Sequence, residues 1–274
     1  MRQFVAEKNL DSKGCLTVEG KKYHYLSSVL RVCSGDMIYV RLTDGSLQQM
    51  TVSLIDSAKK KIVLQCAGDI VQKESIKASP IKNKSSLELW LFMFIAKPPK
   101  MDLIIRQAVE CGVSYIVPVE GEFSQKGSVE SARKKCDQSD DRWKRIITEA
   151  MEQSGSPVET KILPCVTVSK ACELWKENTL QNADECAAVV LYEQTSGTME
   201  LHCALSKSES IKKAALAVGC EGGISPEEIQ IMQTNGFIPV HFATNILRCE
   251  TAAIYGMAAL QNAIVEKDKW QFRG

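Results

Sequence analysis

The chain has 274 residues, of which 45% are hydrophobic and 24% are charged, and its formal net charge is +1. This composition excludes a disordered or fibrous protein, and the length suits one large domain or two smaller ones. The balanced charge excludes a strongly basic or acidic protein, although residues 1–80 hold 12 Lys and Arg against 8 Asp and Glu. A mildly basic N-terminal part fits a domain that faces a polyanion, and it fits chance variation of the surface equally well.

The cysteine and apolar patterns indicate a cytoplasmic protein. Eleven cysteines occur without CxxC pairs, Met1–Leu10 has no apolar signal-peptide core, and the apolar run Leu89–Ala96 is too short to span a bilayer. We therefore expect reduced thiols and no membrane segment. The three histidines, His24, His202 and His241, are far apart in the sequence and no cluster has metal spacing, so we expect no metal site.

The first 70 residues read as short strands. Apolar and polar residues alternate in Leu16–Gly20. Residues 35–66 hold three β-rich runs, which are separated by turns at Asp44-Gly45 and at the AKKK sequence. Lys22–Val32 predicts a helix that brings Arg31 beside these strands. These patterns favour a small all-β barrel.

The next segment, residues 69–86, is polar and has no periodicity, which predicts a linker. We therefore expect one domain over residues 1–72 and a second over residues 73–274.

From residue 87 onward strands alternate with helices. The predicted strands are Leu87–Ala96, Tyr115–Val119, Ala187–Glu193, Ala214–Cys220 and Gly236–Phe242. The predicted helices include Pro99–Gly112, Ser139–Gly155 and a long final helix over Asn245–Lys267. Alternation of this kind predicts an α/β fold with a mainly parallel sheet covered on both faces. Ligands of such sheets bind at the carboxyl ends of the strands, so the loops after Glu193, Cys220 and Phe242 become the candidate site.

The loop within Leu216–Ile229 (LAVGCEGGISPEEI) places an acid between glycines. It matches neither the dinucleotide fingerprint nor the P-loop, and by itself it favours a tight strand-to-helix turn. Ser225, Pro226 and Glu228 predict a helix start with a capping box, which would hold the loop rigidly. Glu221 at the tip disfavours a phosphate and suits a cationic or hydroxyl-bearing ligand. S-adenosylmethionine has both of these features and no phosphate.

The segment Asn245–Gly256 places Arg248 and Glu250 at the start of the final helix. Glu250 suits the positive end of the helix dipole. A first-turn salt bridge between the two side chains and an arginine aimed at the oxygens of a substrate are equally good interpretations.

Five segments in order resemble the RsmE family, whose members are methyltransferases of the SPOUT class that act on N3 of a uridine in 16S ribosomal RNA. Three of the segments, RWKRIITEAMEQSG, VGCEGGISPEE and ILRCETA, carry the most specific similarity. The N-terminal YHYLSSVLRVCSGDMIYV and the helix IIRQAVECGVSYIVPV extend the resemblance over nearly the whole chain.

The resemblance implies a PUA-like β-barrel that binds RNA, followed by a SPOUT domain with a C-terminal trefoil knot. It implies S-adenosylmethionine as cofactor, 16S ribosomal RNA or the small ribosomal subunit as substrate, and a homodimer that uses the final helix. The implied cofactor-binding residues are Leu191, Tyr192, Glu193, Val218, Gly219, Glu221, Gly222, Gly223, Phe242, Ala243, Ile246 and Leu247. The implied RNA-binding residues are Arg31, Glu152 and Gln153.

Transfer to uridine N3 requires loss of the N3 proton while charge develops on O2 and O4. We assign Arg248 to stabilise that charge and Glu250 to orient Arg248 or relay the proton. The target base would be flipped into the pocket, and no histidine falls in a matching motif to act as the base.

The chain departs from the family pattern at six places. Cys220 replaces the proline of GPEGG, and Phe242-Ala243 replaces the LG before ILR. Neutral residues stand at four positions that are usually basic, namely Gln107, Phe123, Ser156 and Asn245. Each lost cation removes a potential phosphate contact. Two alternatives therefore stay open: a SPOUT methyltransferase with another RNA target, and a non-catalytic RNA-binding or ribosome-assembly protein with a decayed pocket.

Overall fold

The computed structural model describes residues 3–66 without Gly45, residues 87–137, and residues 141–267 without Lys207 and Glu209. These residues form two compact units. The first holds the described residues up to 66 together with Met151–Pro157, and the second holds residues 87–150 and those from Val158 onward. The predicted linker and the boundary at residue 72 lie outside the described residues.

The first unit is built on a five-stranded sheet of order β1-β3-β4-β5-β2. Its strands are β1 (Gln3–Val5), β2 (Cys15–Glu19), β3 (Met37–Arg41), β4 (Leu47–Asp56) and β5 (Lys61–Cys66). The three predicted β-rich runs are β3, β4 and β5, which pair antiparallel as expected from the short turns between them. β1 pairs parallel to β3, and one face of the sheet buries a separate apolar core.

The helix predicted over Lys22–Val32 is shorter and begins earlier. α1 (Gly20–His24) continues as a π-helical turn, η1 (Tyr25–Val29), and the helix ends before Arg31. Arg31 has a positive φ of 54°, a left-handed backbone that stops a helix and that sequence periodicity does not reveal. Its side chain is exposed.

The second unit is built on a seven-stranded sheet in which every pairing is parallel, where the sequence predicted a mainly parallel sheet. The order is β12-β10-β11-β6-β7-β8, and β9 also pairs with β7. Its strands are β6 (Glu88–Phe94), β7 (Tyr115–Glu120), β8 (Lys161–Ile162), β9 (Val166–Thr167), β10 (Cys186–Leu191), β11 (Lys213–Val218) and β12 (Ile238–Val240). β6 and β11 lie in the middle and are almost wholly apolar because both faces of the sheet are covered.

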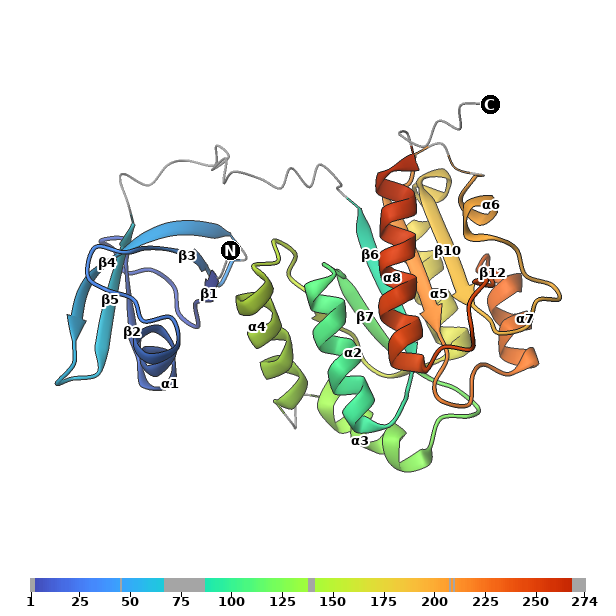
Figure 1. The fold of residues 1–274 in the computed structure, drawn as a ribbon, viewed down its shortest axis with the longest axis horizontal. Helices are drawn as coiled ribbons and strands as arrows, with labels where there is room; N and C mark the ends of the chain where they lie inside the picture. The colour runs from blue at the N-terminus through green and yellow to red at the C-terminus, as the bar shows by residue number, and fades with distance from the viewer. Residues whose placement is uncertain are drawn as a thin grey trace. The chain divides into compact units, whose positions relative to one another are not determined.

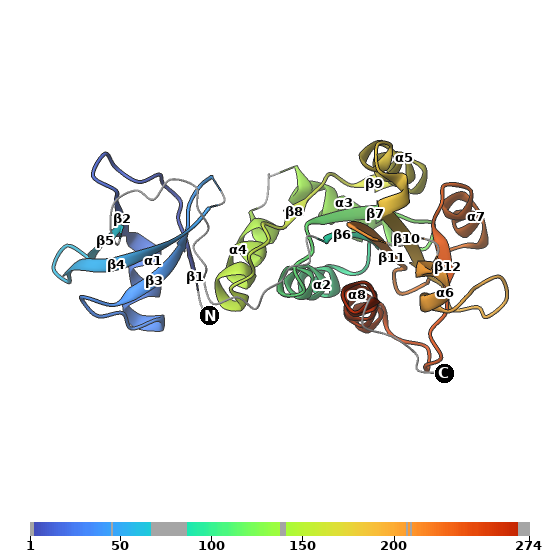
Figure 2. The ribbon, with the colours of Figure 1, turned by 90° about the horizontal axis from the view of Figure 1, so that it is seen from above.

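Helices cover both faces of this sheet (Figures 1 and 2). α2 (Pro98–Glu110) and α8 (Cys249–Val265) pack together on one face, and α5 (Val168–Thr179) and α7 (Pro226–Thr234) pack together on the other. The remaining helical elements are α3 (Lys126–Cys136), α4 (Arg142–Ser154), η2 (Ala183–Glu185) and α6 (Leu201–Leu205). Among the described residues, no helix is long and apolar enough to cross a membrane.

The final helix begins four residues later than predicted. Asn245–Leu247 are not helical, and Arg248 is the N-cap of α8 with extended backbone angles. Periodicity could not reveal this, because Ile246 and Leu247 continue the apolar pattern although they belong to a loop. The later start leaves residues 241–247 free to line a site rather than to cover the sheet.

Candidate functional site

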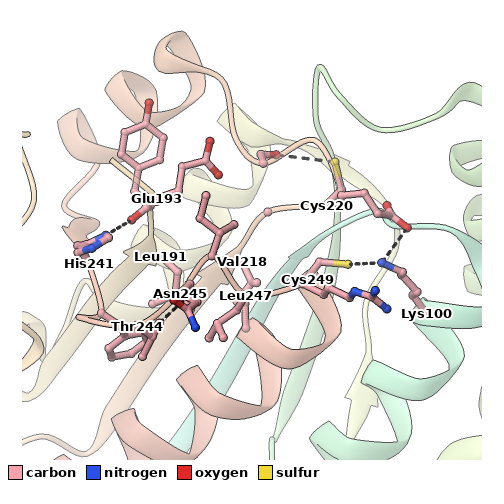
Figure 3. Close-up of a pocket in the computed structure, with 18 residues that line it drawn as sticks. Lys100, Leu191, Glu193, Val218, Cys220, His241, Thr244, Asn245, Leu247 and Cys249 are labelled. Atoms are coloured by element: carbon pink, nitrogen blue, oxygen red, sulfur yellow. Dashed lines mark hydrogen bonds and ion pairs between the residues drawn. The ribbon is translucent and has the colours of Figure 1, made fainter. Parts of the chain in front are cut away.

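A pocket of about 210 Å³ lies where three loops meet at the carboxyl ends of β10, β11 and β12 (Figure 3). This is the edge of the sheet at which the sequence predicted the site, from the alternation of strands and helices. The lining residues are Lys100, Leu191, Tyr192, Glu193, Val218, Gly219, Cys220, Glu221, Gly223, His241, Phe242, Thr244, Asn245, Ile246, Leu247, Arg248, Cys249 and Ala252.

The structure brings most of the predicted cofactor residues together. Ten of the twelve line this pocket, and Gly222 and Ala243 do not. Arg248 lines the pocket as well. Glu250 does not line it, but it forms an ion pair with Lys100, which does. Their clustering follows from parallel strand order, since residues far apart in the chain end at one edge of the sheet.

The loop after β11 is rigid without the proline of the family pattern. The N–H of Gly223 donates to the carbonyl of Cys220 at 3.0 Å, and Gly223 has a φ of +80°, which favours glycine. Cys220 is buried, and its Sγ lies 3.7 Å from the carbonyl oxygen of Gly223. A Cβ on Gly219 would come within 2.8 Å of the Gly223 backbone. A tight, hydrogen-bonded turn therefore fixes the tip that carries Glu221.

The predicted capping box fixes the other end of the same loop. The backbone N–H of Glu228 donates to Ser225 Oγ at 3.4 Å, and Glu228 Oε2 accepts from the N–H of Ser225 at 2.9 Å. Glu228 Oε1 also accepts from the N–H of Glu122 at 2.8 Å, which ties the loop after β7 to α7. The loop after β11 is thus held at both ends.

The loop before α8 combines a packed residue with an exposed one. Phe242, which replaces a leucine of the family pattern, packs edge-on against Tyr255 of α8 with ring centroids 5.1 Å apart. Ile246 is 86% exposed although it lines the pocket. The extra bulk at residue 242 is therefore accommodated by α8, and an apolar side chain stands at the rim.

A cluster of one lysine and two carboxylates lies at the edge of the pocket. Lys100 Nζ lies 2.9 Å from Glu250 Oε2 and 3.7 Å from Glu221 Oε1. The backbone N–H of Lys97 also donates to Glu221 Oε1, at 3.2 Å. Figure 3 shows the Lys100 side chain pointing toward Cys249 and the loop of Cys220. Ion pairs and a hydrogen bond thus join the start of α2, the loop after β11 and the start of α8.

The cluster fixes the protonation of its members. The hydrogen bond to Glu250 raises the pKa of Lys100 despite partial burial. Burial opposes ionisation of Glu250, but hydrogen bonds, above all that from Lys100, lower its pKa overall. Burial and a hydrogen bond to Glu250 raise the pKa of Cys249 to about 12. At neutral pH the pocket edge therefore holds an ammonium, a carboxylate and an uncharged thiol.

Two interpretations of Arg248 and Glu250 were open in the sequence. The structure pairs Glu250 with Lys100, and the first-turn ion pair with Arg248 is absent from the described ion pairs. Sequence reasoning missed Lys100. The signal was available: KPPK directly follows the apolar run Leu89–Ala96, which includes most of β6, and β6 neighbours β11 in the sheet. A basic residue there reaches the carboxyl edge where Glu221 stands.

The predicted RNA-binding residues belong to the first unit. Arg31 and Gln153 are exposed. Glu152 is only 4% exposed, and its Oε1 accepts from Lys22 Nζ at 2.7 Å and from the N–H of Val5 at 3.2 Å. These contacts give Glu152 a structural role within the unit, and an RNA contact by Glu152 stays a prediction.

The four neutral departures lie in different surroundings. Ser156 is buried, and its carbonyl accepts from Arg41 Nη2 at 2.9 Å. Phe123 is partly exposed and packs so closely that a Cβ on Gly222 would come within 2.7 Å of its Cβ. Asn245 lines the pocket, and Gln107 is partly buried on α2. Asn245 therefore lies where a lost cation would change the pocket, and Phe123 lies against the loop that carries Glu221.

The parallel sheet, its covered faces and the pocket built from three strand-end loops define a ligand-binding domain of the α/β class. Residues 83–261 match the family described as the RNA methyltransferase domain. This match covers more than half of the chain, and the chain belongs to that family.

Curated relatives match the chain over nearly its full length. A protein of Borreliella burgdorferi named ribosomal RNA small subunit methyltransferase E 2 is 29% identical over an alignment of 263 residues, and the match covers 94% of this chain and 96% of the relative. Ribosomal RNA small subunit methyltransferase E of Bacillus subtilis is 23% identical over 269 residues, with 94% and 95% covered.

Solved structures share the fold. A ribosomal RNA small subunit methyltransferase E from Neisseria gonorrhoeae, bound to S-adenosyl methionine, has a TM-score of 0.70 and 24% identity and covers 96% of this chain and 97% of its own. A putative methyltransferase from Legionella pneumophila, solved with the same cofactor, has a TM-score of 0.67 and 24% identity, with 96% of each chain covered.

Proposed function

We propose that this protein transfers a methyl group from S-adenosylmethionine to N3 of a uridine in 16S ribosomal RNA. The observation that carries the proposal is the pocket at the carboxyl edge of the sheet, in which Glu193, Glu221 and Arg248 meet in a chain of the RNA methyltransferase family. The names of the relatives, which act on small-subunit ribosomal RNA, support this substrate.

The pocket has groups that fit the proposed cofactor. Glu193 lines it, and among the described residues no basic side chain forms an ion pair with its carboxylate. Such a carboxylate is suited to accept hydrogen bonds from ribose hydroxyls or an amino group. Leu191, Val218 and Leu247 give apolar contact, and the glycines of the β11 loop keep its backbone accessible. We propose the twelve residues named above as the binding set. When bound, S-adenosylmethionine supplies the methyl group.

The residues around the pocket have distinct roles in this proposal. Arg248 stabilises the negative charge on the oxygens of the uracil as the N3 proton leaves. Glu250 and Lys100 act as a positioning pair that fixes the first turn of α8, and hence the Arg248 N-cap. This replaces direct orientation of Arg248 by Glu250, because Glu250 is engaged with Lys100 at 2.9 Å.

We further propose the finer features that the resemblance implies. The first unit would be a PUA-like barrel of residues 1–72 that holds RNA through Arg31, with Gln153 contributed by the segment Met151–Pro157, and the rest of residues 73–274 would form the SPOUT domain. A C-terminal trefoil knot in the second domain is part of the same proposal. Partly exposed Leu103 on α2 and Tyr255 on α8 support a homodimer through these helices. Such an enzyme works in the cytoplasm, where ribosomes assemble.

The decisive experiment maps modified nucleotides in ribosomal RNA from cells with and without the gene. We expect a single N3-methyluridine of the 16S RNA to disappear on deletion and to return with the wild-type gene, but not with Arg248→Ala. Isothermal titration of the purified protein with S-adenosylmethionine is the companion measurement. An unchanged 16S methylation pattern, despite saturable cofactor binding, would overturn the proposed target.

A second candidate is an enzyme of the same fold with a different RNA nucleotide as target. The neutral Asn245 in the pocket and the neutral Phe123 beside Gly222 of the β11 loop favour it, because the usually basic side chains at these positions would contact the substrate. The same mapping distinguishes it: a methyl group would then be lost from another nucleotide.

A further inference from the structure

Two free thiols face each other in the second unit. Cys136 is the last residue of α3, and Cys165 lies between β8 and β9. Their Sγ atoms are 3.5 Å apart, although the residues are 29 positions apart in the chain. Both side chains are partly exposed. A disulfide has an S–S distance of about 2.0 Å, so a closure of roughly 1.5 Å would join them.

The surroundings make the two thiols unequal. The hydrogen bond from Cys165 lowers the pKa of Cys136, and the same hydrogen bond raises the pKa of Cys165. Cys136 is therefore the thiol that ionises first, and the thiolate is the form that reacts with oxidants. Arg133, one turn earlier on α3, pairs with Glu120 at 2.6 Å beside this site and places charge near the thiols.

The position of the pair in the chain gives the link a consequence. Between the two cysteines the chain runs through α4, contributes Met151–Pro157 to the first unit, and returns to the second unit at Val158. Where α4 begins, Arg142 and Trp143 bind the buried Asp102 of α2 at 2.7 and 3.0 Å. Cys136 comes before Arg142 and Trp143 in the chain, and Cys165 comes after Val158. A bond between them would close a covalent loop around the whole excursion.

We propose that Cys136 and Cys165 form a redox-active dithiol that a peroxide converts to a disulfide, closing the α4 excursion at its base. The Cys136 thiolate attacks the peroxide, the O–O bond breaks, and a sulfenic acid and water form. The Cys165 sulfur then attacks the sulfenic sulfur, the S–O bond breaks, and a second water leaves. In total two thiols are oxidised to one disulfide, and one hydrogen peroxide is reduced to two waters. This reaction does not rest on the proposed methyl transfer.

The test uses the full-length, fully reduced protein treated with stoichiometric hydrogen peroxide. Free thiols are blocked with N-ethylmaleimide, and peptides are mapped by mass spectrometry without reduction. We expect one dominant cross-linked peptide pair that joins residues 136 and 165 and is released by dithiothreitol. Cys165→Ser should abolish the cross-link, whereas the matched control Cys111→Ser, also a partly buried thiol of the second unit, should retain it.

A second measurement needs no variant. Closing a loop of this length restricts the unfolded chain, so we expect the Tm of the oxidised wild-type protein to exceed that of the reduced protein by roughly 5 °C or more. Recovery of both cysteines as alkylated free thiols, at peroxide doses that oxidise the exposed Cys33 and Cys203, would overturn the dithiol. A disulfide that forms without raising the Tm would overturn the closure of the excursion.

Discussion

Each unit of the molecule contains a lysine–glutamate pair, and the two pairs differ in what surrounds them. In the first unit Lys22 and Glu152 lie 2.7 Å apart, and Glu152 is buried with a second hydrogen bond from the N–H of Val5. In the second unit Lys100 and Glu250 lie 2.9 Å apart, remain partly exposed and share the pocket edge with Glu221. The first pair is held by the backbone of β1 and includes a buried carboxylate, whereas the second lies at the edge of a pocket. The comparison teaches that burial and a neighbouring cavity, rather than the ion pair itself, separate a structural role from a functional one.

Arg248→Ala gives the largest expected effect and tests whether the pocket edge works through charge. We expect methyl transfer to fall by roughly 100- to 1000-fold, the usual loss when a group that stabilises developing negative charge is removed. Binding of S-adenosylmethionine should change little. Single-turnover methylation of 16S RNA is the measurement, and Arg106→Ala, an exposed arginine of α2 outside the pocket, is the control. Near-normal turnover would remove Arg248 from the chemistry.

Lys22→Met sharpens the structural side of the comparison. It leaves the Glu152 carboxylate buried without its cation, and we expect a loss of about 3 kcal/mol in the free energy of unfolding. Urea denaturation measures it, and cofactor affinity should stay unchanged. The double variant Lys22→Met/Glu152→Gln should recover part of the loss, because no unpaired charge remains. A drop in cofactor affinity as large as that in stability would contradict the assignment.

Lys100→Met tests the functional pair. We expect a loss of about 10-fold in turnover, close to 1.4 kcal/mol, with a smaller loss of stability because the pair is partly exposed. Lys170→Met is a matched control, since Lys170 also lies near two acids, Glu173 and Glu177, but on an exposed helix face. Equal losses of turnover in the two variants would contradict a special role for the Lys100 pair.

The same pair predicts a pH dependence. The pKa of Glu250 is lowered from 4.5, so its contribution to stability is present above that value and is lost as the pH falls through the folded-state pKa. The pKa of Lys100 is raised from 10.5, so its contribution is present below that value and is lost as the pH rises further. We expect Lys100→Met to flatten the unfolding free energy below pH 4.5 and above pH 10.5 relative to wild type, measured by urea titration at each pH.

Ser225→Ala gives the smallest effect. It removes the acceptor at the start of α7, and we expect a loss of about 1 kcal/mol in stability together with a weaker affinity for S-adenosylmethionine. Thr167→Ala removes the matching N-cap of α5, far along the chain from the pocket loops, and should cost similar stability with unchanged affinity. Equal affinities in the two variants would show that the cap does not hold the site.

Much of the fold and of the site was accessible from local patterns. The alternation of strands and helices predicted the parallel sheet, and the Ser225, Pro226 and Glu228 pattern predicted the capping box that is present. The position of strand-end loops predicted the pocket, because ligands of parallel sheets bind at one edge. Boundaries were harder: the start of α8 and the end of the first helix were wrong, since a loop can continue an apolar pattern and a left-handed Arg31 leaves no periodic signal.

The sequence by itself determined which strand-end loops line the pocket and that one of them carries an acid, Glu221, between glycines. Only the tertiary structure decided the partners of the charges: Lys100 rather than Arg248 meets Glu250, and Lys22 meets Glu152 across a gap of 130 positions in the chain. It also brought Cys136 next to Cys165. The physical reason is that helix caps, turns and apolar periodicity depend on residues that are close in the sequence. Ion pairs and thiol contacts instead depend on distances between remote residues, which strand order and packing set.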